Sequence, residues 1–98
     1  MGLKDQYDFS LLVNEAEEVV IEELEKQFAA EKFKNICKCE DCTMDMAALS
    51  LNKLEPEYRS SFTGVIYAQR LHTGTYKEKV EKIVTDAIEK ISKNPSHS

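Results

Sequence analysis

Apolar residues recur at steps of three and four along residues 10–31, the spacing that places side chains on one face of an α-helix. No Gly or Pro interrupts this segment, and Ser10 stands where it can cap the first turn. We therefore predict a long helix over residues 10–31, with Asn14 as a buried hydrogen bonder that fixes a register. The stripe is too broad for a lone surface helix, so we expect part of it to face a second chain. It comprises Val13, Ala16, Val20, Leu24 and Phe28, widened by Leu12, Val19 and Ile21.

A second long helix is predicted over residues 75–93, where apolar residues again follow helical spacing. Pro95 closes it, because proline cannot donate the next backbone hydrogen bond and disfavours helical geometry in the residue before it. We expect residues 1–9 and 94–98 to be flexible ends. The apolar positions of this helix are Tyr76, Val80, Ile83, Val84, Ala87, Ile88 and Ile91.

The middle of the chain is less regular. Residues 43–53 have an apolar side that indicates a shorter helix, which Pro56 brings to an end. Residues 62–72 contain Val and Ile, which favour a strand, but a single strand would have no partner, so we expect a short helix or an irregular segment. The pattern predicts an all-α fold: a small helical domain with two long helices and a Cys-rich turn that leads into a short middle helix.

The length of 98 residues indicates a single domain over residues 1–98. A chain this short builds a small core, and small domains commonly gain stability from a metal, disulfides or a partner chain. The small core and the surplus apolar surface of the long helices together favour a homodimer. Apolar runs of three or four residues are too short to span a membrane, and the first six residues lack the apolar region of a secretory signal. We therefore expect a cytoplasmic protein with no membrane contact.

The formal net charge of −5 counts against a general nucleic-acid binder, which should be basic. The charge is unevenly spread along the chain. Residues 1–31 contain nine acidic and two basic residues, whereas residues 32–98 contain nine acidic and eleven basic residues. An anionic ligand is therefore expected to bind the second part of the chain.

The three cysteines fall within six residues, in the spacing C-x-C-x-x-C. Without a secretory signal a structural disulfide is a poor interpretation, and it would leave one thiol over. The pair Cys39 and Cys42 has the spacing of half a zinc knuckle, and Cys37 can supply a third sulfur if the chain turns at Lys38. Cys42 also stands at the start of the predicted middle helix, where the helix N-terminus favours a thiolate. We therefore predict that these three cysteines hold zinc.

A closed structural zinc site needs a fourth ligand. The candidates are a carboxylate near the cysteines, a histidine further along the chain, a group from a second chain, or water. Three protein ligands with water would also suit a catalytic zinc. The sequence shows no pattern for a general base or a substrate cleft, so we expect that the protein is not an enzyme. Buried or redox-active thiols without a metal are the other alternative. The candidate fourth ligands within the chain are His72, Glu40, Asp41 and Asp45.

Two arginines, Arg59 and Arg70, flank a stretch that contains aromatic residues. Arginine binds phosphate in a bidentate manner, and aromatic faces stack on bases, so together they would suit a nucleotide with few phosphates. The plainer interpretation is two surface arginines beside core aromatics. The aromatic residues in question are Tyr58, Phe62 and Tyr67.

The chain resembles the ComFB family of late competence proteins. The resemblance rests on Asn14 and Glu18, on the cysteine motif, and on the dense segment from Asp45 to Tyr58, which reads DMAALSLNKLEPEY. It covers about residues 10–93 and implies an all-helical fold, a symmetric dimer, metal at the three cysteines and a link to DNA uptake.

Some members of the family are described as receptors for cyclic dinucleotides. We therefore predict a non-enzymatic, zinc-binding, dimeric regulatory protein of late competence that takes a cyclic dinucleotide. We place this ligand at Arg59 and Arg70, with Tyr58 and Tyr67. The alternative is a nucleic-acid-binding accessory protein of competence.

Overall fold

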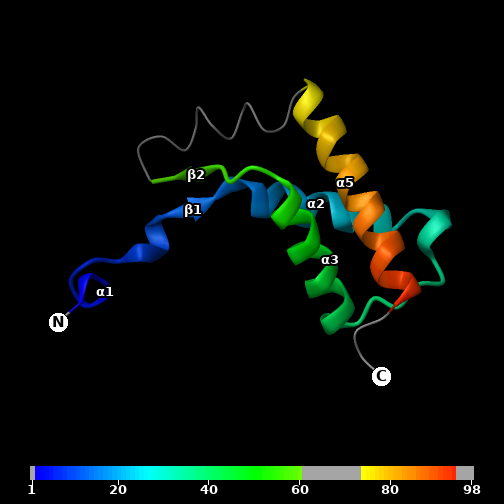
Figure 1. Ribbon diagram of the computed structural model, residues 1–98, viewed down its shortest axis with the longest axis horizontal. Helices are drawn as coiled ribbons and strands as arrows, with labels where there is room; N and C mark the ends of the chain where they lie inside the picture. The colour runs from blue at the N-terminus through cyan, green and yellow to red at the C-terminus, as the bar shows by residue number, and fades with distance from the viewer. Residues whose placement is uncertain (1, 61–73, 95–98) are drawn as a thin grey trace.

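The computed structural model describes residues 2–60 and 74–94, and this part of the chain is mainly α-helical (Figure 1). The body consists of three helices of 14 to 20 residues. A short helix, a 3-10 turn and a two-residue strand precede the first of these helices, and a second 3-10 turn and a second short strand lie between consecutive helices. In chain order the elements are α1 (Leu3–Gln6), a 3-10 turn (Phe9–Leu11), β1 (Val13–Asn14), α2 (Glu15–Phe28), a 3-10 turn (Glu31–Phe33), α3 (Glu40–Lys53), β2 (Tyr58–Arg59) and α5 (Gly74–Lys93).

The first long helix is shorter than its apolar pattern predicted, because it begins at Glu15 and not at residue 10. Asn14 caps it: its side-chain oxygen accepts a hydrogen bond from the backbone N–H of Ala16 at 3.2 Å. The same oxygen accepts a second hydrogen bond from the backbone N–H of Glu57 at 2.9 Å. Asn14 therefore fixes a register as expected, but between the start of α2 and a distant part of the same chain, and it is half-buried.

The mainly helical architecture agrees with the all-α expectation, and a small antiparallel pair of two-residue strands is the one addition to it among the described residues. Val13 of β1 lies opposite Arg59 of β2, and Asn14 lies opposite Tyr58. The backbone N–H of Glu15 extends this pairing by donating to the carbonyl of Glu57 at 2.8 Å. Of the residues predicted to start the helix, Val13 and Asn14 belong to this ladder, while Ser10 and Leu11 lie in the 3-10 turn before it.

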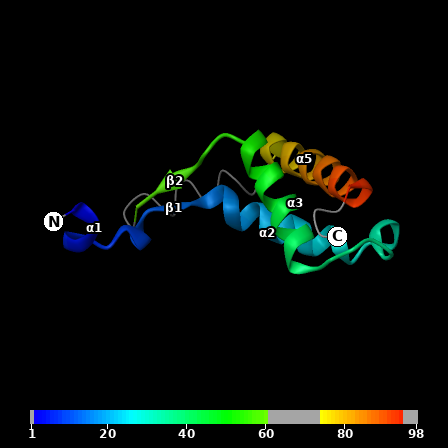
Figure 2. The ribbon, with the colours of Figure 1, turned by 60° about the horizontal axis from the view of Figure 1, so that its bottom comes forward.

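The middle helix α3 begins three residues earlier than predicted and contacts both α2 and α5 (Figures 1 and 2). Its buried residues are spaced by four, so they form one line along the helix: Cys42, Met46 and Ser50. The Ser50 hydroxyl donates to the Met46 carbonyl at 2.8 Å, which satisfies the polar group inside the core. The chain leaves the helix at Leu54, before Pro56, as predicted.

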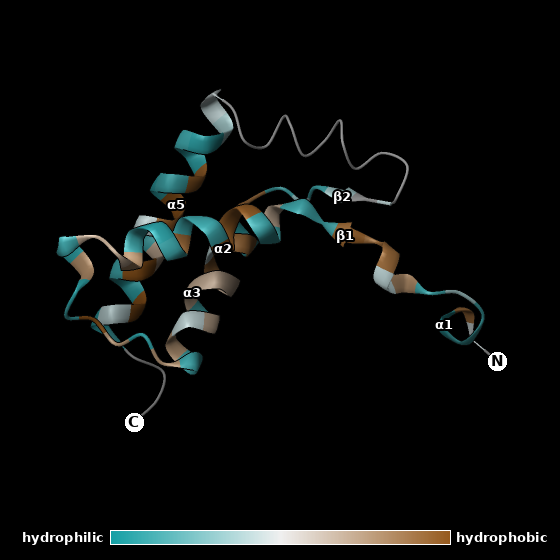
Figure 3. Cartoon of the chain, turned by 180° about the vertical axis from the view of Figure 1, so that it is seen from behind, coloured by the Kyte–Doolittle hydropathy of each residue, from teal (hydrophilic) through white to brown (hydrophobic). Residues whose placement is uncertain are grey.

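The predicted second long helix is confirmed within one residue, since α5 runs from Gly74 to Lys93. Gly74 has a φ angle of +57°, a left-handed conformation that other residues rarely adopt. The three long helices contact one another pairwise, and hydrophobic positions gather on the faces between them (Figure 3). The most deeply buried apolar side chains of this core are Val20, Met46, Val80, Val84 and Ile88.

Residues 3–12, which we call the arm, extend away from the three helices beyond β1 (Figures 1 and 2). Every residue of the arm is exposed. The flexibility expected for residues 1–9 and 94–98 stays a prediction, and residues 95–98 lie outside the described part. None of the helices in the described ranges combines the length and the apolar character that a membrane span requires.

Candidate metal centre

The cysteine motif forms the entry to α3. Cys39 is the N-cap residue, with extended backbone angles, and its sulfur accepts a hydrogen bond from the backbone N–H of Cys42 at 3.4 Å. The Cys39 carbonyl accepts from the N–H of Thr43 at 2.9 Å, which starts the helical ladder. Cys39 thus stands where Ser, Thr, Asn or Asp usually cap a helix, and its thiol does the same work.

The three sulfur atoms lie within 4.8 Å of one another. In a tetrahedral zinc site with Zn–S bonds of about 2.3 Å, neighbouring sulfurs are about 3.8 Å apart. A small closing of the loop would therefore bring Cys37, Cys39 and Cys42 onto one ion. The donor set, three soft sulfur ligands, suits zinc better than magnesium or calcium, which prefer oxygen.

The two cysteines at the ends of the C-x-x-C pair have opposite electrostatic surroundings. The hydrogen bond from the N–H of Cys42 lowers the pKa of the Cys39 thiol, so the cap stabilises a thiolate there. Burial, followed by hydrogen bonding with the neighbouring thiols, raises the pKa of Cys42 to about 12. The sequence placed the thiolate-favouring position at Cys42, and that was wrong, because Cys42 points into the core while Cys39 takes up the free N–H group.

The loop that carries Cys37 is attached to the core on both sides of the motif. Ile36 and Cys37 pack against the main hydrophobic cluster, of which Cys42 and Phe33 are buried members. The Lys38 ammonium lies over the Phe28 ring at the end of α2, 5.7 Å from its centroid. The cysteines are therefore presented on a supported turn.

Within residues 2–60 and 74–94, no acidic side chain joins the sulfur cluster. Among the described residues, the cluster whose ligand atoms all lie within 4.8 Å of one another contains the three cysteines alone, so Glu40, Asp41 and Asp45 are not part of it. The remaining candidate from this chain, His72, lies outside the described residues. Within the described part, a metal would thus have three protein ligands.

The expected nucleotide-binding residues are only partly described. Tyr58 lies in β2 with 56% of its surface exposed, so its ring is not a core aromatic. Arg59 follows it in the same strand. Phe62, Tyr67 and Arg70 lie outside the described residues.

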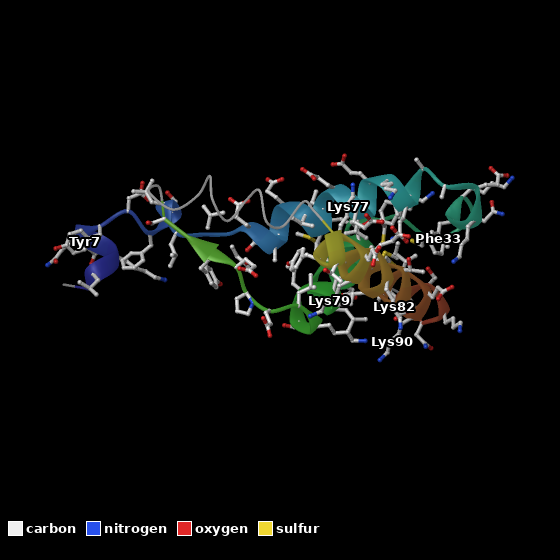
Figure 4. The ribbon with its side chains drawn as sticks, turned by 90° about the horizontal axis from the view of Figure 1, so that it is seen from above. Tyr7, Phe33, Lys77, Lys79, Lys82 and Lys90 are labelled. Carbon is white, nitrogen blue, oxygen red and sulfur yellow. The ribbon has the colours of Figure 1, made fainter. Side chains whose placement is uncertain are left out.

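The sequence analysis missed the exposed lysines of α5, of which Lys79, Lys82 and Lys90 form a row on one side of the helix and Lys77 lies on another side (Figure 4). None of the ion pairs within the described ranges involves Lys77, Lys79, Lys82 or Lys90. The helical spacing of Lys79 and Lys82 can be read from the sequence, but the formal net charge of −5 for the whole chain does not indicate a local group of cations. These four side chains are cations available to an anionic partner.

Fold and site together define a small helical domain with a three-cysteine candidate metal centre at a helix N-terminus. The sequence profile of the family described as "Late competence development protein ComFB" matches residues 13–95. The chain belongs to the ComFB family, and the resemblance noted from its motifs is confirmed.

Two comparisons show how similar the chain is to a known member. It is 36% identical over 59 residues to the competence protein ComFB of Bacillus subtilis (strain 168). The aligned segment covers 60% of this chain and 58% of that protein. The chain thus matches somewhat over half the length of this curated relative. A solved structure described as "Structural characterization of the late competence protein ComFB from Bacillus subtilis" superposes with a TM-score of 0.68 and 28% identity, over 88% of this chain and 96% of the other.

Proposed function

We propose that this protein is a non-enzymatic regulatory protein of late competence that binds zinc through Cys37, Cys39 and Cys42 and acts as a homodimer. The observation that carries the proposal is the cluster of three sulfur atoms within 4.8 Å at the capped start of α3. Zinc bound there would supply a structural cross-link, as it does in other small domains. The family membership supports the association with competence.

The chain's own residues prepare this site in three ways. Cys39 is held as the helix cap and has a lowered pKa. Cys42 is anchored in the core, only 1% exposed, so its sulfur cannot swing away. Ile36 packs on the same core and brings Cys37 up to the other two. A metal would therefore tie the loop before α3 to the helix itself.

The proposed ligand of the regulator is a cyclic dinucleotide, bound by Arg59 and Arg70 with Tyr58 and Tyr67. The exposed ring of Tyr58 supports this proposal, since it offers a flat face for a base. Arg59 is its neighbour and would supply a guanidinium for a phosphate. A two-fold dimer would present the set twice, which matches the symmetry of the ligand.

Nucleic-acid binding is the second candidate function, and the lysine row of α5 favours it. Three cations on one side of α5, Lys79, Lys82 and Lys90, have no described ion-pair partner and could lie along a phosphate backbone. The overall charge of −5 opposes this candidate.

Elemental analysis of protein purified without added metal tests the zinc proposal. We expect one zinc per chain, loss of zinc in Cys37→Ser, and retention in the control Asp45→Asn, because that carboxylate does not join the sulfur cluster. Zinc-free protein, or full zinc content in Cys37→Ser, would contradict the site. Calorimetry with cyclic di-GMP, cyclic di-AMP and a short DNA duplex separates the two candidate functions, since each predicts heat from a different titrant.

A further inference from the structure

The three cysteines differ in their access to solvent, although their sulfur atoms lie within 4.8 Å of one another. Cys39 is exposed, Cys37 is half-buried, and Cys42 is buried with 1% of its surface exposed. A small water-soluble reagent can therefore reach the Cys39 side chain, whereas the protein covers that of Cys42. The cluster combines an accessible thiol with a protected one.

Cys39 and Cys42 occupy the start of α3 with the spacing C-x-x-C. Cys39 is the N-cap residue, and Cys42 follows in the first turn of the helix. The backbone N–H of Cys42 donates to the Cys39 sulfur at 3.4 Å, which holds that sulfur next to Cys42. The same spacing in redox motifs lets two cysteines close one disulfide. These two residues therefore have the arrangement of a redox pair as well as that of a metal site.

We propose that Cys39 is an oxidation site, at which a peroxide closes a Cys39–Cys42 disulfide and displaces the metal. This rests on the zinc site of the proposed function and names its regulation by an oxidant. A thiolate is the form of cysteine that binds a metal. Formation of the disulfide removes two of the three sulfur ligands, so zinc and the disulfide exclude each other.

The oxidation proceeds in two balanced steps. The Cys39 sulfur attacks one oxygen of hydrogen peroxide, the O–O bond breaks, and the second oxygen leaves as hydroxide, so that a sulfenic acid forms. The Cys42 sulfur then attacks the Cys39 sulfur, and the S–O bond breaks as a second hydroxide leaves. Each hydroxide becomes water with a proton from the reacting thiol, or from solvent when zinc had replaced that proton. The sulfurs lose two electrons, the peroxide gains them, and zinc leaves as the hydrated ion.

Cys42 is a better second partner for Cys39 than Cys37 is. An S–S bond is about 2.05 Å long, and the exposed Cys39 side chain can rotate at the cap to close the remaining gap to Cys42. A Cys37–Cys39 bridge would have to close over Lys38 alone, and short loops are the hardest to close. Lys38 is also held at the Phe28 ring, 5.7 Å from its centroid.

Peptide mapping locates the bond, because trypsin cleaves after Lys38 and separates Cys37 from the other two cysteines. Zinc-loaded and chelator-treated protein would be exposed to hydrogen peroxide, alkylated in urea and digested. We expect peptide 39–53 without alkylation and lighter by two hydrogens, and peptide 35–38 alkylated at Cys37. A chromogenic zinc indicator should report zinc release in step with the disulfide, and dithiothreitol should restore both alkylation and zinc binding.

Two variants of the metal-free protein assign the roles of the sulfurs. Cys39→Ser should lower the rate of peroxide consumption by about tenfold or more, because the accessible thiol is gone. Cys42→Ala should react at the parent rate, since the sulfur that peroxide attacks is still present. Cys37→Ser is the matched control and should form the same disulfide at the parent rate. Far-UV circular dichroism checks that all three variants fold.

The outcomes separate the oxidation site from the metal site. A bond that joins peptides 35–38 and 39–53, a bond between chains, oxidation to sulfinic acid without a disulfide, or thiols that stay reduced would overturn the oxidation site. Each of these results leaves the zinc proposal standing in protein that contains zinc. Zinc that stays bound after the disulfide closes would overturn the displacement. Protein purified without zinc would overturn the metal site, while the peptide map would still decide whether Cys39 and Cys42 are a redox pair.

Discussion

The sulfur of Cys39 accepts a hydrogen bond from the backbone N–H of Cys42, over 3.4 Å, at the first turn of α3. One contact therefore combines a helix cap with half of a candidate metal site. A helix N-terminus leaves N–H groups without intrahelical partners and carries a partial positive charge, and both favour a thiolate on the capping side chain. The cap and the metal site can be separated by substitution.

Cys39→Ser and Cys39→Ala should differ when metal is absent. In chelator, serine preserves a cap, so we expect unfolding free energies within about 0.5 kcal/mol of the parent chain, whereas alanine should lower stability by about 1 kcal/mol. In the presence of zinc, both variants should lose the increment that zinc gives the parent. Urea denaturation with and without zinc measures this. A serine variant that keeps the full zinc increment would show that Cys39 is not a ligand.

Removal of metal should destabilise the protein. Ile36 and Cys37 already pack on the core, and zinc would add a cross-link between this loop and the first turn of α3, so the bound ion should add to the stability of the folded state. A ligand that binds only the folded state stabilises it by about 4 kcal/mol when its free concentration is about 1,000 times its Kd. We expect a lower Tm in strong chelator and recovery on addition of zinc. An unchanged melting curve, with metal loss confirmed by elemental analysis, would count against the structural role.

Asn14→Ala should destabilise the junction of α2 with β2. The variant removes the acceptor for the backbone N–H groups of Ala16 and Glu57, and loss of a cap and of a partly buried hydrogen bond should cost about 1–2 kcal/mol. Asn14→Asp is the control, because it keeps an oxygen at the same place and should stay close to the parent. Chemical denaturation decides between them, and equal losses in both variants would contradict the acceptor role.

Gln27→Leu should weaken the contact between α2 and α5. The Gln27 side chain donates to the buried Glu23 carboxylate at 2.7 Å and to the Glu81 carbonyl at 3.2 Å, and the Thr85 hydroxyl donates back to it at 2.9 Å. Leucine removes the donor to the buried Glu23 carboxylate, whereas the Thr85 hydroxyl and the Glu81 carbonyl keep their mutual hydrogen bond at 2.8 Å. We therefore expect a loss of about 1–3 kcal/mol in unfolding free energy.

Glu25→Gln, an exposed change on the same helix, serves as the control for Gln27→Leu. It should shift stability by no more than about 0.5 kcal/mol. A Gln27→Leu variant as stable as this control would mean that the polar network contributes nothing.

Arg59→Ala and Arg70→Ala should each weaken binding of a cyclic dinucleotide by about 10-fold to 100-fold, corresponding to a lost charged hydrogen bond of about 1.5–3 kcal/mol. Lys90→Ala removes one cation from the α5 row and should leave this affinity unchanged. Isothermal titration calorimetry measures all three. If both arginine variants bind as the parent does, the ligand sits elsewhere; a parent that binds no cyclic dinucleotide would refute the receptor function.

The helical body was predictable because periodicity is a local property of the sequence. Spacing alone identified the buried faces through Val20, Leu24, Val84 and Ile88. The start of α2 was not predictable in this way. It is set by the hydrogen bond between Asn14 and Glu57, which are 43 positions apart, and the strand pair that displaces the first helical turns depends on the same long-range contact.

The candidate metal centre was likewise predictable from the sequence only in part. The spacing of the cysteines sufficed to bring their sulfurs together, and it also placed Cys42 in the first turn of a helix. The spacing does not tell which thiol is stabilised as a thiolate, because the burial that raises the pKa of Cys42 arises from packing with other elements. The extra turn at the start of α3 was missed because Cys39 is an unusual capping residue.

Zinc K-edge X-ray absorption on protein purified without added metal tests the central claim most directly. The account predicts zinc with a shell of three sulfur atoms at about 2.3 Å, lost when Cys37, Cys39 and Cys42 are replaced by serine. Zinc surrounded only by nitrogen and oxygen, or the same sulfur shell in the serine variant, would contradict it.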